Sequence, residues 1–172
     1  MKRKVIFFIL LVIFLGAGSA ILLKNRGGKP VEKNEDYDLS LSGWDFRLPD
    51  ISGEMVSLND FNGRVILLTF WMIGCPYCIR EIPILKRIQS KYNEKDVKII
   101  SVVIGEEGER VKKFKVREEI PYLILLDEKH EVAHLYKVIG VPTDIIIDRK
   151  GKMVYYNFFW PKNLEEIIEG LL

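Results

Sequence analysis

Cysteine and histidine are scarce in this sequence, whose 172 residues include two of each. No cysteine lies near the N-terminus, which excludes a lipid-modified N-terminal cysteine. The two cysteines, Cys75 and Cys78, are three positions apart. A structural disulfide across so short a loop would stabilise the fold very little. Their spacing therefore favours redox chemistry over a structural bridge or half of a metal site.

An excess of charge of one sign is also missing. Lys and Arg number 26 against 24 Asp and Glu, which gives a net charge of +2. The two signs are mixed along the chain and no basic face stands out, so we expect no nucleic acid among the partners. The chain has no internal repeat and no low-complexity segment, and its length suits one ordinary domain.

The longest uncharged run is Val5–Leu23, which follows the basic start Met1-Lys2-Arg3-Lys4. Its length is about that needed to span a bilayer as a helix. Basic residues ahead of such a helix favour an N-terminus left in the cytoplasm. We therefore predict a single-pass anchor in the cytoplasmic membrane, with the rest of the chain on its outer side. A signal peptide cleaved after Gly18-Ser19-Ala20 is the alternative, although Ile21-Leu22-Leu23 continues the apolar run.

The predicted anchor (residues 1–23) is followed by a polar segment, residues 24–38, whose Gly, Pro and mixed charges are typical of a tether. Residues 39–172 form the predicted domain. The turn signal Ser52-Gly53 between two short alternating runs predicts an N-terminal β-hairpin. Later strands are predicted at 65–71, 97–104, 122–126, 143–148 and 153–158, and helices at 76–92, 106–119, 130–138 and 163–172. This order predicts an α/β domain with a mixed central sheet and helices on both faces.

The cysteines lie where the apolar strand Val65–Trp71 gives way to a helical pattern. Pro76 suits the first helical position, where its missing N–H leaves no bond unmade. Cys75 would then sit at the helix start, which favours its thiolate. Cys78, one turn further in, would be the resolving thiol. The pair thus predicts thiol–disulfide exchange through a mixed disulfide.

Three groups of residues, taken in chain order, resemble one family. They are Phe46-x-Leu48-Pro49-Asp50 with Gly53-x-x-Val56-x-Leu58, then Phe70-Trp71 with Cys75-x-x-Cys78-x-x-Glu81-x-Pro83, and finally Gly140-Val141-Pro142-Thr143. Together they resemble the TlpA/ResA group of membrane-anchored disulfide oxidoreductases. The resemblance implies a thioredoxin-like fold and no cofactor beyond a redox-active Cys75–Cys78 disulfide.

The resemblance also implies roles for individual residues. Pro142 would be cis and packed beside the cysteines, with the Val141 backbone free to pair with an extended substrate. Glu81 would lie near the active site and exchange protons with the thiols. Further substrate contacts are expected at Trp71, Gly74, Pro76, Tyr77 and Thr143.

The implied partners are a protein disulfide, in particular apocytochrome c during cytochrome c maturation, and a membrane electron donor of thiol type. Nothing basic lies between the cysteines or immediately before them, so we expect a reductase rather than a strong oxidant. The sequence departs from the family at Gly74, where many members have Trp. Thr69 stands where thioredoxins carry a buried Asp, which leaves Glu81 as the one nearby acid expected.

Three other functions are alternatives to this one. A metal-delivery protein would combine Cys75 and Cys78 with His130 and His134, and a thiol pair suits Cu(I). A peroxidase of the peroxiredoxin kind would need Pro and Thr upstream of its cysteine, where this chain has Leu68 and Met72. A domain that only binds would not need the cysteines. The cluster Phe158-Phe159-Trp160-Pro161 is predicted as core and strand end, or as a docking patch for an apolar partner.

Overall fold

The structure is a computed structural model that describes residues 44–172. The predicted anchor, residues 1–23, and the predicted tether, residues 24–38, lie outside the described residues. The same holds for residues 39–43, the first of the predicted domain. Within residues 44–172, no helix has both the length and the apolar composition needed to cross a membrane.

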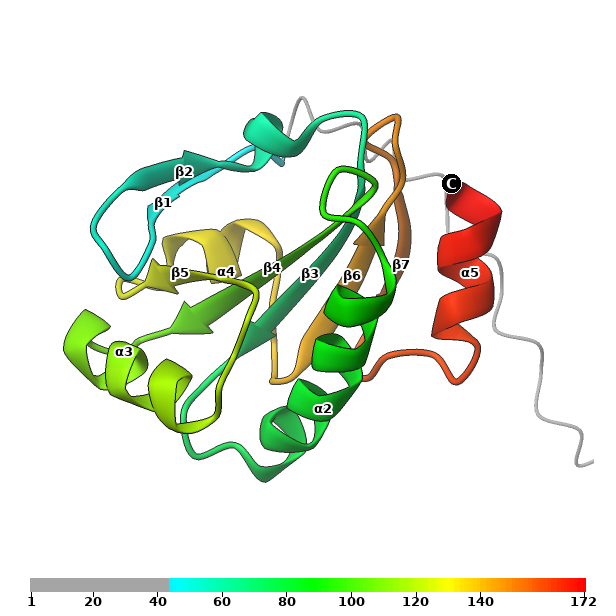
Figure 1. Ribbon diagram of the computed structural model, residues 1–172. Helices are drawn as coiled ribbons and strands as arrows, with labels where there is room; N and C mark the ends of the chain where they lie inside the picture. The colour runs from blue at the N-terminus through cyan, green and yellow to red at the C-terminus, as the bar shows by residue number, and fades with distance from the viewer. Residues whose placement is uncertain (1–43) are drawn as a thin grey trace, which may run out of the picture. The chain divides into compact units, whose positions relative to one another are not determined.

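A five-stranded mixed sheet forms the centre of the domain, in the order β5-β4-β3-β6-β7 (Figure 1). The middle strand β3 (Val65–Trp71) is parallel to β4 (Val97–Ile104) and antiparallel to β6 (Thr143–Ile147). The edges are β5 (Leu123–Asp127) and β7 (Met153–Asn157). Every residue of β3 is buried, because both faces of the sheet are covered, and this explains its continuous apolar sequence.

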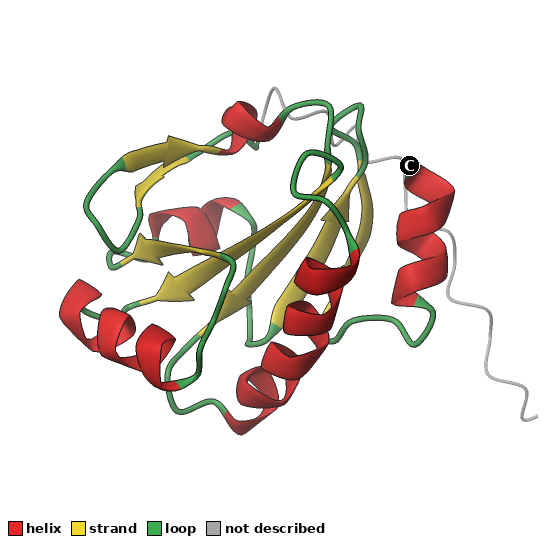
Figure 2. Cartoon of the chain, viewed as in Figure 1, coloured by secondary structure: helices red, strands yellow, loops and turns green. Residues whose placement is uncertain are grey.

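Helices α2 (Pro76–Lys91), α3 (Gly108–Arg117) and α5 (Leu164–Leu171) contribute buried residues to one face of the sheet (Figure 2). Helix α4 (Glu131–Leu135) covers the other face together with the N-terminal hairpin. Two separate hydrophobic cores result. The helix-side core includes Val65, Leu67, Trp71, Leu85, Ile88, Phe114, Ile146 and Ile168. The hairpin-side core includes Phe46, Leu48, Leu58, Ile66, Leu68, Phe70, Tyr136 and Ile145.

The alternation of side chains along β3 and β6 decides which residues face which core. Odd-numbered apolar residues of β3 belong to the helix-side core and even-numbered ones to the hairpin-side core. On β6, Ile146 belongs to the helix-side core, whereas Ile145 and Ile147 belong to the hairpin-side core. The polar residues Thr69 and Asp144 therefore both point toward the face covered by α2. They are directly opposite each other in the β3–β6 register.

The N-terminal hairpin consists of β1 (Arg47–Pro49) and β2 (Met55–Ser57), and a 3-10 helix, η2 (Leu58–Phe61), follows it. Tyr136 joins this region to the sheet. Its ring lies 5.3 Å from that of Trp44 and 5.3 Å from that of Phe70, measured between centroids. Its hydroxyl donates a hydrogen bond of 2.7 Å to the Trp44 carbonyl. The hairpin is thus part of the hairpin-side core and not an appendage.

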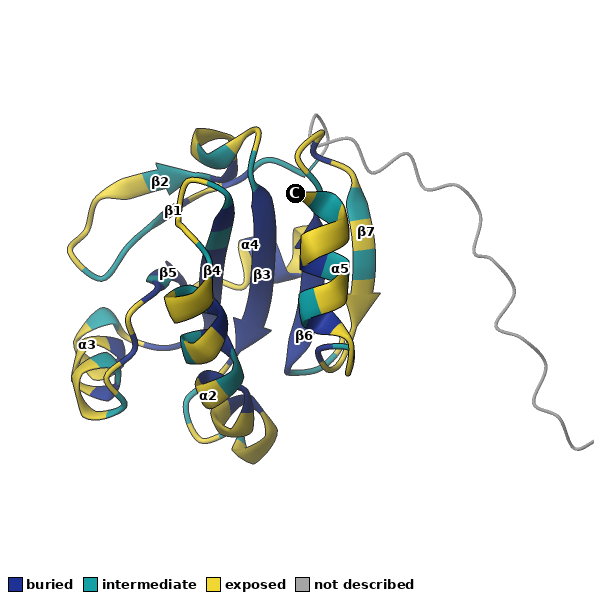
Figure 3. Ribbon diagram, turned by 45° about the vertical axis from the view of Figure 1, so that its right-hand side comes forward, coloured by how far each residue is buried: buried dark blue, intermediate teal, exposed yellow. Residues whose placement is uncertain are grey.

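The predicted elements are all present, and the differences concern their ends. Helices α3 and α4 are shorter than predicted. His130 has a left-handed backbone with φ of 63°, so α4 begins after it. Asn163 occupies the N-cap position of α5 but its side chain makes no capping hydrogen bond. The burial colouring of Figure 3 shows the central strands dark and the outer face of α5 exposed.

Candidate active site

Cys75 and Cys78 form a disulfide at the N-terminus of α2. Cys75 is the N-cap residue and Pro76 the first helical residue, as predicted. The Cys78 backbone N–H donates a hydrogen bond of 3.2 Å to Cys75 Sγ. This N–H is one of the donors that a helix start leaves unpaired, so it favours a thiolate on Cys75 in the reduced protein. Cys75 is half-buried and Cys78 is 4% exposed, which confirms the predicted asymmetry.

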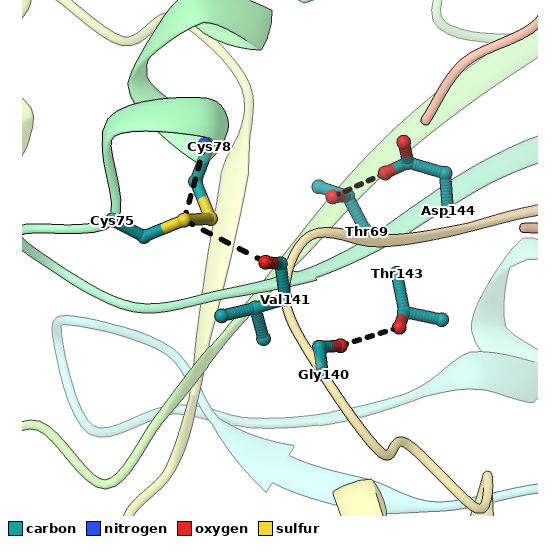
Figure 4. Close-up of a disulfide and its surroundings, with 7 residues drawn as sticks. All are labelled: Thr69, Cys75, Cys78, Gly140, Val141, Thr143 and Asp144. Atoms are coloured by element: carbon teal, nitrogen blue, oxygen red, sulfur yellow. Dashed lines mark hydrogen bonds between the residues drawn. A yellow bond between two sulfur atoms is a disulfide. The ribbon is translucent and has the colours of Figure 1, made fainter. Parts of the chain in front are cut away.

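The loop Gly140–Thr143 lies directly against the disulfide (Figure 4). The Val141 carbonyl oxygen is 3.8 Å from Cys75 Sγ. The Val141–Pro142 peptide bond is cis, as the family resemblance implied. The Thr143 hydroxyl donates a hydrogen bond of 2.7 Å to the Gly140 carbonyl and so fixes the loop from within. Among the described residues, no backbone hydrogen bond uses the Val141 N–H, which leaves it available to an incoming chain.

The residues predicted as substrate contacts divide into accessible and buried ones. Gly74, Pro76 and Tyr77 are exposed. Gly74 has φ of 91°, a backbone conformation that a residue with a side chain would adopt only with strain. Trp71 is 4% exposed and its ring packs on that of Phe114 at 5.2 Å, so it does not offer a side-chain contact at the surface. The predicted substrate contact at Trp71 was therefore wrong. Both faces of β3 are covered, so a side chain of this strand is buried whichever face it points to.

Thr143 is likewise buried, and its hydroxyl is bonded within the loop. Its side chain therefore positions Gly140 and does not contact a substrate from the outside.

An exposed aromatic edge adjoins the disulfide. Tyr77 is 53% exposed and its ring meets that of Phe159 edge-on at 5.8 Å. Phe158 is also exposed, and its ring lies so close to Gly140 that a Cβ there would be 3.2 Å from it. Trp160, by contrast, belongs to the helix-side core. The predicted cluster therefore splits into two exposed rings beside the loop and one core ring.

Two buried acids, and not one, lie behind the disulfide. Glu81 is 6% exposed and Asp144 is 0% exposed. The Thr69 hydroxyl donates a hydrogen bond of 2.7 Å to Asp144 Oδ1, and the Glu81 and Asp144 carboxyls lie close enough for each to shift the pKa of the other. The expectation that Glu81 is the only nearby acid was wrong. The family position at Thr69 does lack an Asp, but the neighbouring strand supplies one at the same height.

Burial controls the proton affinity of both acids. It raises the pKa of Glu81 from its ordinary 4.5 to about 7, against the opposing effect of hydrogen bonds from Asp144 and from the Trp160 N–H. Burial, followed by the nearby Glu81 charge, raises the pKa of Asp144 from its ordinary 3.8 to about 10. Glu81 lies one helical turn after Cys78 on the same buried face of α2. A group able to exchange protons near neutral pH thus stands behind the resolving cysteine.

The residues of the metal-delivery alternative do not come together in one site. His130 and His134 lie at the start and within α4, and both are exposed. Within residues 44–172, no group of three or more His, Cys, Asp or Glu side chains is placed to hold a metal ion. Cys75 and Cys78 therefore do not join the histidines in a common centre, and the metal-delivery alternative is without structural support.

Comparison with known proteins gives consistent matches. The AhpC/TSA family matches residues 43–156. ResA thiol-disulfide oxidoreductases are similar over most of their length. That of Bacillus cereus is 28% identical over 90% of this chain and 88% of its own, and that of Geobacillus kaustophilus 33% identical over 74% of each.

Solved structures agree with these matches. A putative thiol:disulfide interchange protein DsbE from Chlorobium tepidum has a TM-score of 0.66 and 29% identity, over 75% of this chain and 91% of its own. StoA from Bacillus subtilis has a TM-score of 0.62 and 25% identity, over 74% of this chain and 96% of its own.

The chain belongs to the AhpC/TSA family. With its homology to the ResA proteins and its Cys75–Cys78 pair, it is a thiol-disulfide oxidoreductase of the ResA/DsbE type with a thioredoxin-like fold. The family match does not revive the peroxidase alternative, because Leu68 and Met72 still occupy the positions where that chemistry needs Pro and Thr.

The residue that sequence reasoning missed is Asp144. A signal was present in the run Thr143-Asp144-Ile145-Ile146-Ile147, where one acid stands inside an otherwise apolar strand. An acid in such a run is expected to be buried and therefore partnered. Its partner was beyond reach, because the pairing with Thr69 spans 75 residues of sequence.

Proposed function

We propose that this protein is a membrane-anchored reductase of protein disulfides that acts outside the cytoplasmic membrane. The single observation that carries the proposal is the position of Cys75. It caps a helix, receives the Cys78 N–H and lies half-exposed beside the Val141 backbone. This arrangement favours attack by a Cys75 thiolate on a disulfide brought against that backbone.

The reaction is two successive exchanges. In the reduced protein, the Cys75 thiolate attacks one sulfur of the substrate disulfide, and the other substrate sulfur leaves as a thiolate and takes up a proton. Cys78 then loses its proton and attacks Cys75 Sγ, so that the second substrate sulfur leaves and the Cys75–Cys78 disulfide forms. Two electrons pass from the dithiol to the substrate, and no cofactor beyond the cysteines takes part.

Glu81 is the group that accepts the Cys78 proton in this scheme. It follows Cys78 by one turn of α2, and both side chains are buried on the face toward the sheet. Its raised pKa suits exchange with a thiol better than an ordinary carboxylate would, because transfer is most effective between groups of similar proton affinity.

The substrate is an extended protein segment that pairs with Val141. Its side chains would meet the exposed surface around Gly74, Pro76 and Tyr77, with Phe158 and Phe159 beside them. Pro142 packs behind this strip and carries no N–H that would compete for the substrate carbonyls. The resemblance to the TlpA/ResA group suggests a cytochrome c maturation role, with apocytochrome c as the substrate and a thiol-type donor in the membrane.

Direction of electron flow follows from how strongly the reduced form is stabilised. The Cys78 N–H is the one donor to Cys75 Sγ within the described residues, and the nearest basic side chain in sequence, Arg80, stacks over the Tyr77 ring instead. A strong oxidant needs a more heavily stabilised thiolate. We therefore expect a reduction potential nearer about −270 mV than about −120 mV.

Substrate trapping tests this function. Full-length Cys78→Ser protein should accumulate a mixed disulfide with its substrate, which mass spectrometry identifies, whereas Cys75→Ser protein should form none. Equilibration with a dithiothreitol series measures the potential. A midpoint at the oxidant value, or equal trapping by both variants, would contradict the proposal.

The location has its own test. Membrane fractionation followed by protease treatment of intact cells should find the domain attached through Val5–Leu23 and accessible from outside. A soluble mature protein that starts near Ile21 would identify a cleaved signal peptide instead.

A further inference from the structure

Three polar side chains meet inside the helix-side core. Thr69 comes from β3, Asp144 from β6 and Glu81 from α2, and all three are buried. The strand alternation described above directs Thr69 and Asp144 to this face, and the buried stripe of α2 directs Glu81 to it. The fold thus gathers two acids from separate elements in a place that water does not reach.

The hydrogen bonds around these acids do not balance if both are ionised. Asp144 Oδ1 accepts from the Thr69 hydroxyl, and the backbone N–H of Trp160 is near enough to Glu81 to lower its pKa. Asp144 Oδ2 is buried and receives no hydrogen bond from any amide, hydroxyl or cationic group of the described chain. The remaining contact of Asp144 is with Glu81 itself. Two ionised carboxylates are acceptors only, so a hydrogen bond between them requires a proton on one.

We propose that Asp144 carries its proton at neutral pH and donates it in a hydrogen bond to Glu81, which keeps Glu81 a carboxylate able to take the proton of Cys78. The proposal rests on the proposed function for the role of Glu81. Asp144 acts through Glu81 and is a positioning residue. Asp144 is the more buried of the two acids and its pKa is raised the further, which places the shared proton on it.

The proton balance of the resolving step is then complete. Before the step the pair holds one proton, on Asp144, and one negative charge, on Glu81. The Cys78 S–H transfers its proton to Glu81, and the Cys78 sulfur attacks Cys75 Sγ. The bond between Cys75 and the substrate sulfur breaks, and that sulfur leaves with the electron pair as a thiolate. Glu81 afterwards returns its proton to solvent, and Asp144 keeps its own throughout.

The other titratable groups that face the pair are two tyrosines. Tyr155 of β7 has its pKa raised mainly by burial and also by the charges of Asp144 and Glu81. Tyr122, which precedes β5, has its pKa raised by burial and by Glu81. Both therefore stay neutral in the range where Glu81 titrates. No cation contributes to the pKa shift of either acid, so the only influences that favour the Glu81 carboxylate are the Asp144 side chain and the Trp160 backbone N–H.

Carboxyl NMR titration of the full-length protein in detergent tests the proposal directly. With ¹³C-labelled Asp and Glu side chains, the Asp144 signal should be that of a protonated acid at neutral pH while Glu81 titrates. Asp144→Asn should leave the Glu81 midpoint nearly unchanged, because the amide donates where the acid did. Asp144→Val removes the donor and should raise the midpoint pH of the Glu81 titration. At a pH below that midpoint, the ionised fraction of Glu81 should then be roughly tenfold smaller.

Thr69→Val is the matched control. It removes the hydroxyl from Asp144 but leaves the donor to Glu81 in place, so the Glu81 titration should be unaffected. Should Asp144 instead be ionised, Asp144→Asn would replace a negative neighbour by a neutral donor and lower the Glu81 midpoint sharply. That result, or an ionised Asp144 signal at neutral pH, overturns the proposal, and Asp144→Asn is isosteric, so folding does not confound it.

Kinetics supply the functional readout. Release of a chromogenic thiol from its mixed disulfide with Cys75 measures the Cys78 attack. Near neutral pH, Asp144→Val should slow release roughly tenfold, and Asp144→Asn should restore it to within about twofold. Equal rates in all variants would contradict the role of Asp144. Capture of a substrate by Cys78→Ser does not depend on this result. The proposed function and the proposed role of Asp144 are therefore tested separately.

Discussion

The two faces of the central sheet are built differently although the same strands supply both. In the hairpin-side core the buried polar groups have partners. The Tyr136 hydroxyl donates to the Trp44 carbonyl, and the buried Asp127 carboxylate at the end of β5 accepts from the Val132 and Ala133 N–H groups of α4. The helix side holds the buried pair Glu81 and Asp144. It also holds the three buried side-chain atoms that have no hydrogen bond with an amide, hydroxyl or cationic group of the described residues: Trp71 Nε1, Trp160 Nε1 and Asp144 Oδ2.

Unsatisfied polar groups destabilise a core, so their concentration on one face has a meaning. The hairpin side is packed as expected for stability, with apolar side chains and hydrogen-bonded polar groups. The helix side departs from them where the disulfide, Glu81 and Asp144 lie, and such departures are typical of functional sites. Stability and chemistry are thus divided between the two faces of one sheet.

Adjacent leucines of β3 provide the largest test of this division. Leu67 and Leu68 are both fully buried but point to opposite faces. Either change to Ala should lower the free energy of unfolding by about 2–5 kcal/mol, measured by denaturant titration. Only Leu67→Ala should also shift the Glu81 titration, because its cavity opens beside the acids. Equal shifts in both variants would remove the distinction.

The next largest effect concerns the pH dependence of stability. Glu81 and Asp144 have folded pKa values above their ordinary values, so protonation favours the folded state. Their contribution is most favourable below about pH 4 and is lost progressively as the pH rises toward about 7 and beyond. Glu81→Gln removes the part of this loss that comes from ionising Glu81. The variant should therefore gain stability over wild type as the pH rises, by the order of a few kcal/mol at about pH 8.

Comparison with wild type at each pH is essential, because surface acids with lowered pKa values, such as Glu165 and Glu169, act in the opposite direction. Glu166→Gln, on the exposed side of α5, is the control and should change little. A gain that does not grow between about pH 5 and about pH 8 would mean that Glu81 is ionised in the fold at no cost.

A somewhat smaller change is expected in the exchange kinetics of Glu81→Gln. Loss of the proton acceptor should slow the Cys78 attack roughly tenfold to a hundredfold and flatten its pH profile near neutral pH. Stopped-flow release of a chromogenic thiol from Cys75 measures it, again with Glu166→Gln as the control. An unchanged profile would make Glu81 a bystander and leave the helix side without a proton acceptor.

The smallest effect is expected on the opposite face. Tyr136→Phe removes the hydroxyl that donates to the Trp44 carbonyl but keeps the ring contacts, so stability should fall by about 1 kcal/mol. The pH profile of exchange should not move, since no titrating group of the site contacts this ring. Thermal unfolding and the same release assay measure both quantities. A shifted profile would show that the faces are coupled through β3.

Much of the fold could be predicted from the sequence because its signals are local. Apolar runs mark the strands, and Pro76 next to Cys75 marks the helix start. The disulfide site followed from this junction alone. The loop at Pro142 followed from the family resemblance, since no local pattern places it beside the cysteines.

The remainder depends on which strands pair and in which register. A substrate contact at Trp71 was expected from the family resemblance, whereas its ring is buried because β3 is covered on both faces. Asp144 meets Thr69 because β6 runs antiparallel to β3 in one register out of several. A shift by one residue would turn Asp144 into the hairpin-side core. The predicted anchor and tether remain predictions.

The alternation along β3 also bears on how the protein can be engineered. Volume-conserving apolar changes are tolerated in cores, so a library confined to the hairpin side can raise the melting temperature without touching the residues that exchange electrons and protons. Mutations that raise stability often lower activity. In this domain the two properties can be changed separately, because successive side chains of β3 belong to different cores. Leu68 and Phe70 are open to volume-conserving changes for stability, whereas Glu81 and Asp144 on the opposite face are not.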